Sequence, residues 1–106
     1  MYHFFDALRV EVVPPGEIVV LSVRVSDTRV DEYRFAATSF REMTEAYRNL
    51  PEAWSGPEGL RVRVDTVQRL ASLSVLVCPA KREVYRIQQA QFEAMTAQFR
   101  SQDGGA

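Results

Sequence analysis

Residues 21–25 read LSVRV, and the same pattern returns 52 positions later, where residues 73–77 read LSVLV. The match extends in both directions, because residues 8–54 align without a gap on residues 60–106 with 14 identities in 47 aligned pairs. Average composition gives about one chance match in seventeen pairs, so the similarity is far above chance. We therefore expect a single domain, residues 1–106, made of two pseudo-symmetric halves of about 1–52 and 53–106.

Each half begins with two segments that read as strands. Apolar residues alternate over residues 8–13 and 17–25, and again over residues 60–65 and 70–77. A period of two is typical of a strand that is buried on one face only. The sequence therefore predicts two strands in each half, joined by turns.

A long helix is predicted after the second strand of each half. Ser26 and Asp27 are typical of a helix N-cap, and Pro79 is favoured in the first turn of a helix. Apolar residues at helical spacing then extend the two predicted helices from about 28 to 49 and from about 80 to 101. The tail from Gln102 onward is expected to fray.

The resulting ββα-ββα order belongs to the α+β class. Right-handed connections would place residues 17–25 and 70–77 side by side and parallel in the centre of one four-stranded sheet. Both long helices would cover one face of that sheet, as in a permuted ferredoxin-like fold. Two ββα units that meet edge to edge around a different strand order are the alternative.

The repeat also predicts the core. Positions on the inward face in both copies should be buried, and the largest of them come in matched pairs. These residues are Leu21, Val23, Phe40, Leu73, Val75 and Phe92.

The composition excludes several classes of protein. Thirteen basic and fourteen acidic residues give a net charge of −1, which excludes a basic protein that coats DNA. The single cysteine, Cys78, and the single histidine, His3, exclude a disulfide framework and a multi-histidine metal centre. We predict no catalytic residue, no cofactor and no metal ion.

No apolar run approaches 18 residues and the start does not resemble a signal peptide, so a cytoplasmic protein away from the membrane is expected.

Two small groups of side chains are candidates for a reactive site. Cys78 and His3 are the only thiol and imidazole of the chain. A helix N-terminus lowers the pKa of a nearby thiol and so activates it. We favour the simpler interpretation that Cys78 is a small residue at the junction between a strand and a helix. The pair Tyr33-Arg34 recurs as Tyr85-Arg86. It forms either a pseudo-symmetric site or, as we favour, tyrosines packed at the core edge with arginines paired to Asp31 and Glu83.

The open face of the predicted sheet is the candidate interaction surface. It combines small and aliphatic side chains with arginines, which suits close packing against another protein. Its residues are Ile18, Val20, Ser22, Arg24, Ser72, Ser74, Leu76, Arg9, Arg61 and Arg63. We predict a protein partner on this face, most simply a second copy of the chain in a homodimer.

Three functions follow from these features. The first is a small non-catalytic protein-interaction or regulatory module, for example a phage-encoded inhibitor or assembly factor. The second is a nucleic-acid-binding module that uses the open sheet face and its arginines. The third is a small ferredoxin-like enzyme with a pocket around Cys78, His3 or the tyrosines.

Overall fold

A computed structural model describes residues 2–4, 7–14 and 16–102 of the chain. It contains eight longer elements, four from each copy of the repeat, preceded by one short strand. In chain order they are β1 (Tyr2–Phe4), β2 (Ala7–Val13), β3 (Ile18–Ser26), β4 (Arg29–Ala36), α1 (Ala37–Arg48), β5 (Leu60–Asp65), β6 (Leu70–Cys78), β7 (Lys81–Gln88) and α2 (Gln89–Gln102). The α+β class is confirmed.

The strands form two separate sheets rather than one. β2, β3 and β4 make an antiparallel sheet, which we call sheet B, and β5, β6 and β7 make a second antiparallel sheet, sheet A, to which β1 adds in parallel beside β7. The predicted single four-stranded sheet with two helices on one face, the permuted ferredoxin-like fold, is therefore wrong. β3 and β6 do not pair with each other, because β3 lies between β2 and β4 and β6 lies between β5 and β7.

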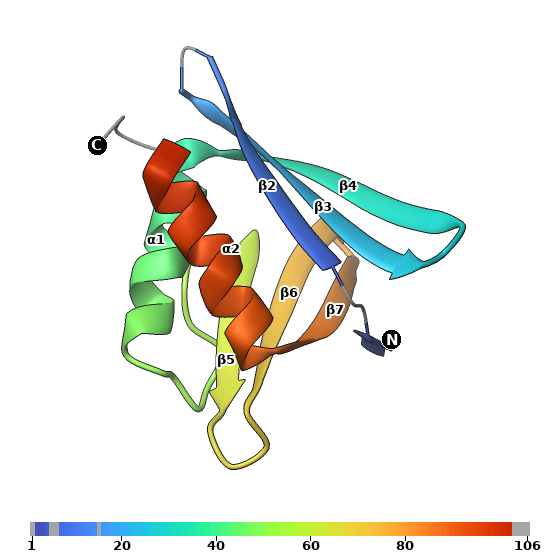
Figure 1. The fold of residues 1–106 in the computed structure, drawn as a ribbon, viewed down its shortest axis with the longest axis vertical. Helices are drawn as coiled ribbons and strands as arrows, with labels where there is room; N and C mark the ends of the chain where they lie inside the picture. Colours follow the sequence, from blue (N-terminus) through green and yellow to red (C-terminus); the bar gives the residue numbers. More distant parts are fainter. Residues whose placement is uncertain (1, 5–6, 15, 103–106) are drawn as a thin grey trace.

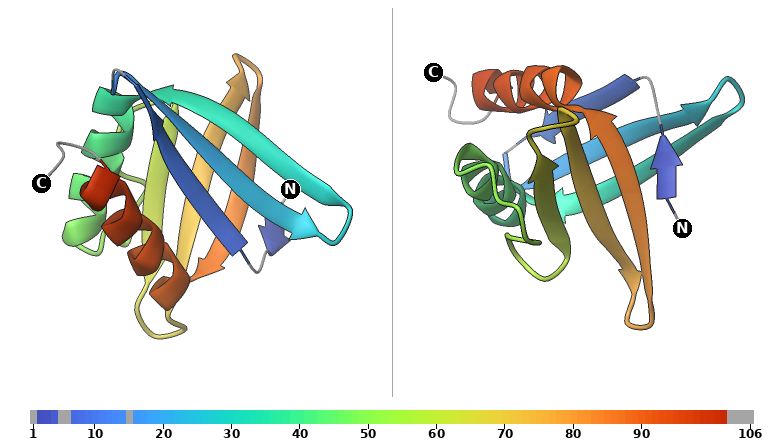
Figure 2. Two further views of the ribbon diagram at one scale, coloured as in Figure 1. Left: turned by 45° about the horizontal axis from the view of Figure 1, so that its top comes forward. Right: turned by 90° about the horizontal axis from the view of Figure 1, so that it is seen from below.

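The two sheets cross at an angle and share one interior. Figure 2 shows both helices at one end of the molecule and the tips of the β3–β4 and β6–β7 hairpins pointing away from them. α1 packs along β5 and α2 packs along β2, so each helix covers the first strand of the opposite half (Figure 1). This exchange of helices joins the two halves through a single core.

Elements of the two halves recur at the spacing of the repeat. β6 and β7 begin and end 52 residues after β3 and β4, and each central strand has a register shift at the equivalent place, between Arg24 and Ser26 and between Leu76 and Cys78. The helices also begin alike, because Ala37 N–H donates to the Glu17 carbonyl at 2.8 Å and Gln89 N–H to the Arg69 carbonyl at 2.9 Å. Each half is thus βββα, with one more strand than the predicted ββα.

The extra strand occupies the first part of each predicted helix. Residues 27–28 and 79–80 form two-residue turns between antiparallel strands, so Asp27 and Pro79 belong to turns rather than to a helix cap and a first helical turn. The helices are consequently shorter than predicted, at 12 and 14 residues. Gln102 is the last residue of α2 rather than part of a frayed tail, and residues 103–106 lie outside the described part of the chain.

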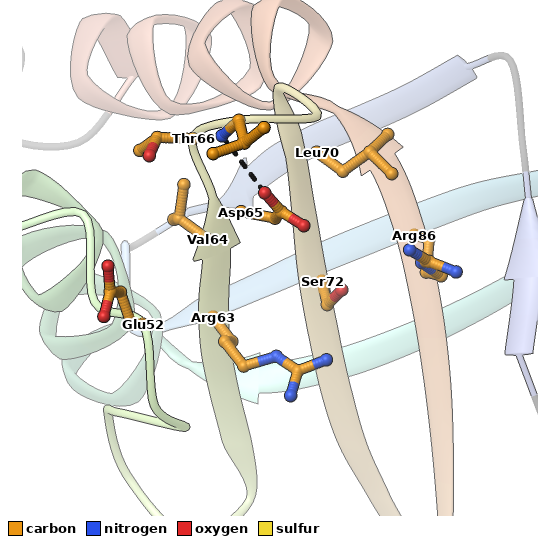
Figure 3. Close-up of a pocket in the computed structure, with 9 residues that line it drawn as sticks. Glu52, Arg63, Val64, Asp65, Thr66, Leu70, Ser72 and Arg86 are labelled. Atoms are coloured by element: carbon orange, nitrogen blue, oxygen red, sulfur yellow. Dashed lines mark hydrogen bonds between the residues drawn. The ribbon is translucent and has the colours of Figure 1, made fainter.

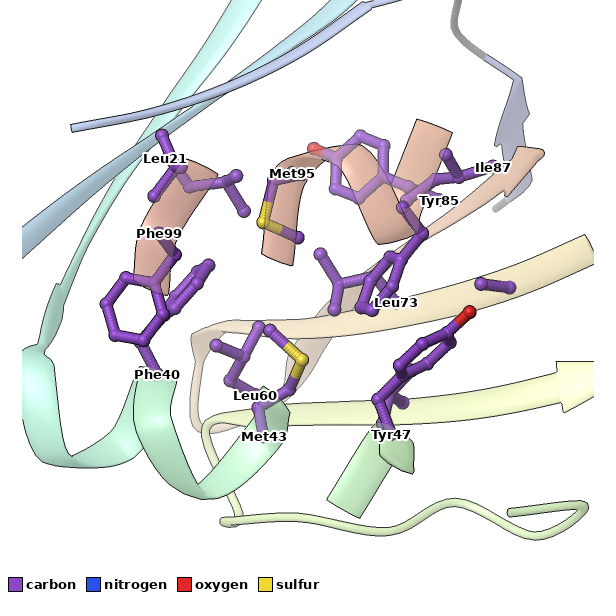
Figure 4. Close-up of a cluster of buried hydrophobic side chains, with 14 of the residues drawn as sticks. Leu21, Phe40, Met43, Tyr47, Leu60, Leu73, Tyr85, Ile87, Met95 and Phe99 are labelled. Atoms are coloured by element: carbon purple, nitrogen blue, oxygen red, sulfur yellow. The ribbon is translucent and has the colours of Figure 1, made fainter. Parts of the chain in front are cut away.

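The core confirms the predicted inward positions. Leu21, Val23, Phe40, Leu73, Val75 and Phe92 are each at most 1% exposed. Two aromatic contacts join the helices. Phe40 contacts Phe99 with 4.7 Å between ring centroids (Figure 4), and Tyr47 contacts Phe92 at 4.5 Å; the repeat relates one contact to the other. Val77, two residues after the inward Val75 in the strand predicted over residues 70–77, is nevertheless 48% exposed because the register shift between Leu76 and Cys78 turns it outward.

Candidate interaction surfaces

The predicted interaction residues lie on two faces of the molecule, not on one. Because both inner faces contribute to the same core, the outer faces of the two sheets point in different directions. Sheet B carries Arg9, Ile18, Val20, Ser22 and Arg24, whereas sheet A carries Arg61, Arg63, Ser72, Ser74 and Leu76. The continuous patch expected from a single central sheet is therefore not formed.

The outer face of sheet B brings three of the predicted residues together. The register places Arg9 opposite Ser22 and Arg24 opposite Val30. Arg9, Ser22, Arg24 and Val30 line a shallow hollow of about 270 Å³. We call this surface face B, defined by these four residues with Ile18 and Val20.

Face B exposes aliphatic side chains. Val30 is 58% exposed, Ile18 is 41% exposed, and Val20 between them in the sheet is half-buried. Val30 was missed because residues 28–36 were assigned to a helix. The alternation of Tyr33 and Phe35, both directed to the inner face of β4, was the available signal for a strand.

The outer face of sheet A differs because arginines cover its centre. Ser72 and Ser74 are only 6% and 4% exposed although they lie on the outer side of β6. β5 places Arg63 and Arg61 on one side of them, and β7 places Arg86 beside Ser72 on the other. We call this surface face A: Arg61, Arg63, Ser72, Ser74, Arg82 and Arg86.

Two arginines of face A are held by neighbouring groups. Arg82 donates from Nη1 to Ser74 Oγ at 2.9 Å and from Nη2 to the Glu58 carbonyl. The Arg63 guanidinium lies over the Trp54 ring, 5.1 Å from its centroid, which is the geometry of a cation–π contact. The guanidinium groups therefore lie along the sheet rather than extending freely into solvent.

A second hollow, of about 330 Å³, opens at one end of face A (Figure 3). Arg63 and Arg86 lie opposite Ser72 on the two neighbouring strands, and Glu52 and Asp65 also line the hollow. Asp65 is occupied locally, since its Oδ1 accepts the backbone N–H of Val67 at 3.1 Å. The lining of the hollow therefore combines two guanidinium groups and one hydroxyl with two carboxylates.

The repeated tyrosines meet between the sheets. Tyr85 O–H donates to Asp31 Oδ2 at 2.8 Å, and because it has one proton to give, the neighbouring Tyr33 O–H donates to Tyr85. Arg29 completes the group, with Nε 3.0 Å from Asp31 Oδ1. Burial raises the pKa of both phenols, so both hydroxyls stay protonated at neutral pH.

This cluster corrects the predicted partner of Arg34. Asp31 is bound by Arg29 and Tyr85, and Arg34 lies 3.8 Å from Glu32 on the exposed outer side. Each described hydroxyl and carboxylate of the cluster is engaged by the fold itself. The arrangement joins β4 to β7 and so serves to connect the two halves.

Another phenol joins the helices. Tyr47 O–H donates to Glu93 Oε2 at 2.9 Å, and burial followed by this hydrogen bond raises the pKa of Tyr47 to about 12. The hydroxyl therefore acts as a hydrogen-bond donor between α1 and α2 across the neutral range.

The remaining reactive candidates, Cys78 and His3, lie on different strands. Cys78 is exposed at the end of β6, before a hairpin turn, so the predicted helix N-terminus is not beside it. His3 lies in β1, and its side chain is outside the described part of the structure. Within residues 2–4, 7–14 and 16–102, no group of three metal-ligating side chains is found, and no helix is long and apolar enough to cross a membrane.

No family model, curated protein or solved structure matches this chain. The function is therefore inferred from faces A and B.

Proposed function

We propose that the protein is a non-catalytic protein-interaction module that binds a protein partner through face B. The observation that carries this proposal is the exposed Val30, which lines the hollow together with Arg9, Ser22 and Arg24, and a second exposed aliphatic residue, Ile18, lies further along the same face. Exposed aliphatic groups surrounded by charged groups are the usual composition of a protein interface with an apolar centre and a polar rim. A regulatory inhibitor or assembly factor would act in this way, by occupying a surface of its target.

The hollow of face B favours a partner with a projecting apolar side chain. Such a side chain would enter the hollow beside Val30, and acidic groups around it would meet Arg9 and Arg24. Burial of apolar surface would supply most of the affinity, at about 25 cal/mol per Å². The arginines would determine orientation and the rate of association.

The test compares matched substitutions on the two outer faces. Val20→Glu places a charge at the centre of face B, and Leu76→Glu makes the same change to a half-buried aliphatic residue of sheet A. A partner captured with the unmodified protein is purified and its binding measured by calorimetry. We expect Val20→Glu to weaken binding at least a hundredfold and Leu76→Glu to leave it within about threefold, with unchanged circular dichroism. Equal binding by both variants would contradict the proposal.

Nucleic-acid binding is the second candidate, and the observation that favours it is face A. Four guanidinium groups surround Ser72 and Ser74, and Arg63 lies against an aromatic ring that could stack on a base. Arg9 and Arg24, which were predicted to join Arg61 and Arg63 in this role, lie on the other sheet. A strand of phosphates would therefore run along sheet A alone.

Salt dependence tests this second candidate. Fluorescence anisotropy measures the affinity for single-stranded oligonucleotides. If several phosphates are neutralised, this affinity should fall steeply between about 50 and about 200 mM salt. Arg61→Glu with Arg63→Glu should abolish binding, and Arg9→Glu with Arg24→Glu should preserve it. Binding lost equally in both double variants would show that general charge, not face A, is responsible.

A further inference from the structure

The outer edge of β4 is open, although the equivalent edge of β7 is covered. β1 pairs in parallel with β7, with Tyr2 opposite Val84 and Phe4 opposite Arg86. In the repeat these positions of β7 correspond to Glu32 and Arg34 of β4. Among the residues that the structure describes, no strand pairs with β4 on the side away from β3.

The other long edges are protected within the fold. Along β2, Val12 N–H donates to Gln102 Oε1 at 2.8 Å, and Gln102 Nε2 donates to the Val10 carbonyl at 3.1 Å. Along β5, residues 51–55 supply backbone bonds, including Val62 N–H to the Ser55 carbonyl at 2.8 Å. β1 is only three residues long. Exposed edges are sites of strand pairing, and proteins usually cover or shorten them, so the eight residues of β4 are an exception.

The inward residues are also more deeply buried on β7, whose edge is covered, than on β4, whose edge is open. Tyr85 and Ile87 of β7 are fully buried, whereas the equivalent Tyr33 and Phe35 of β4 are only half-buried. The inner side of β4 thus carries aromatic surface that its own chain leaves partly uncovered.

We propose that β4 pairs antiparallel with β4 of a second copy of the chain, with Tyr33 opposite Tyr33, so that the two copies of sheet B form one continuous sheet. This goes beyond the proposed function, because it concerns the edge of the sheet and names the partner. On the outer side, this register places Glu32 opposite Arg34 of the second copy and Arg34 opposite its Glu32. Val30 lies opposite Ala36 at both ends, so every outer pair is complementary.

Neighbouring registers lack this match. A shift of the pairing in one direction places Glu32 opposite Glu32 of the second copy, and a shift in the other direction places Arg34 opposite Arg34. Both registers bring like charges together, which destabilises the pairing. Shifts by an odd number of residues would bring inner side chains to the outer face. On the inner side, Asp31 lies opposite Phe35 of the second copy, but its carboxylate stays bound to Arg29 and Tyr85.

Charge reversal tests the pairing directly. In a homodimer of the Glu32→Arg variant, an arginine faces an arginine at both pairs of positions 32 and 34. In a homodimer of the Arg34→Glu variant, a glutamate faces a glutamate at both pairs. Both side chains are more than half exposed, so the fold should tolerate either change. Sedimentation velocity should show that the unmodified protein dimerises and that each single variant raises the dimer dissociation constant at least about tenfold.

Mixing the two variants gives the decisive result. In a heterodimer of the Glu32→Arg chain and the Arg34→Glu chain, each arginine is again opposite a glutamate. Native mass spectrometry with one chain isotopically labelled should therefore show heterodimers where each variant alone is monomeric. The double variant Glu32→Arg/Arg34→Glu should dimerise as the unmodified protein does.

Glu11→Arg is the matched control, because it makes the same charge change on an exposed position of β2, at the other edge of sheet B. It should leave the dimer unchanged. A monomeric unmodified protein at high micromolar concentration, a dimer insensitive to both reversals, or no heterodimer on mixing would overturn the proposal. Face B is tested separately by Val20→Glu, so loss of the dimer and loss of the protein partner can be told apart.

Discussion

Strands β4 and β7 occupy the same place in the two repeats and have eight residues each, but their surroundings differ. β7 lies between β6 and β1 and buries Tyr85 and Ile87 completely, whereas β4 forms the rim of sheet B and leaves Tyr33 and Phe35 half-buried. At the outward position next to the central tyrosine, β7 has Val84 and β4 has Glu32. Burial at equivalent positions is thus decided by what lies beside the strand, and duplication leaves one copy free to present an edge.

The core should not share this asymmetry. Phe40 and Phe92 are equivalent, are both fully buried, and contact Phe99 and Tyr47 respectively. Phe40→Ala and Phe92→Ala should each lower the free energy of unfolding by about 3–5 kcal/mol in urea melts. Loss of less than about 1 kcal/mol in either variant would show that the two halves do not share one core.

The tyrosine pair should show the difference between the strands. Tyr85→Phe removes the donor to Asp31 from a fully buried site and should cost about 1–3 kcal/mol of stability. Tyr33→Phe removes a donor from a half-buried site and should cost about 0.5–1.5 kcal/mol. Denaturant melts of both variants and the double variant measure these losses and their coupling. A larger loss for Tyr33→Phe would reverse the assigned roles.

Loss of the side-chain protection of β2 should have an effect no larger than that of Tyr33→Phe. Gln102→Ala removes two hydrogen bonds to the β2 backbone and should cost about 0.5–1.5 kcal/mol. Ser101→Ala is the control, because the Ser101 hydroxyl binds only within its helix, to the Gln98 carbonyl at 2.9 Å. Light scattering of Gln102→Ala should also reveal self-association through the uncovered edge. Equal stability of the two variants would mean that Gln102 does not protect β2.

The repeat and the core could be predicted from the sequence because they depend on local patterns. The period of two over β3 and β6 identified the inward Leu21 and Leu73, and both are fully buried. The third strand could not be separated from the start of a helix. Val30, Tyr33, Ala37 and Phe40 fit helical spacing as well as they fit a strand followed by a helix.

The turn signals carried the same ambiguity. Asp27 and Pro79 favour both a helix start and a two-residue hairpin turn. The hairpin forms because the following residues pair with the preceding strand, β4 with β3 and β7 with β6. With the third strands assigned to helices, β3 and β6 were expected to pair with each other. The candidate residues were therefore placed on one face, although their inward or outward orientation on each strand was correct. Which edge remains open depends on β1 and on Gln102, which lie far from β4 in the sequence.

Amide hydrogen exchange at two protein concentrations tests the open edge of β4 most directly. In dilute solution the amides of β4 that point away from β3 should exchange rapidly, and the equivalent amides of β7, paired with β1, should exchange slowly. At a concentration where the dimer forms, the β4 amides should become protected while β7 is unchanged. Equal protection of β4 and β7 in dilute solution, or rapid exchange of β4 at every concentration, would contradict the pairing of β4 with a second copy.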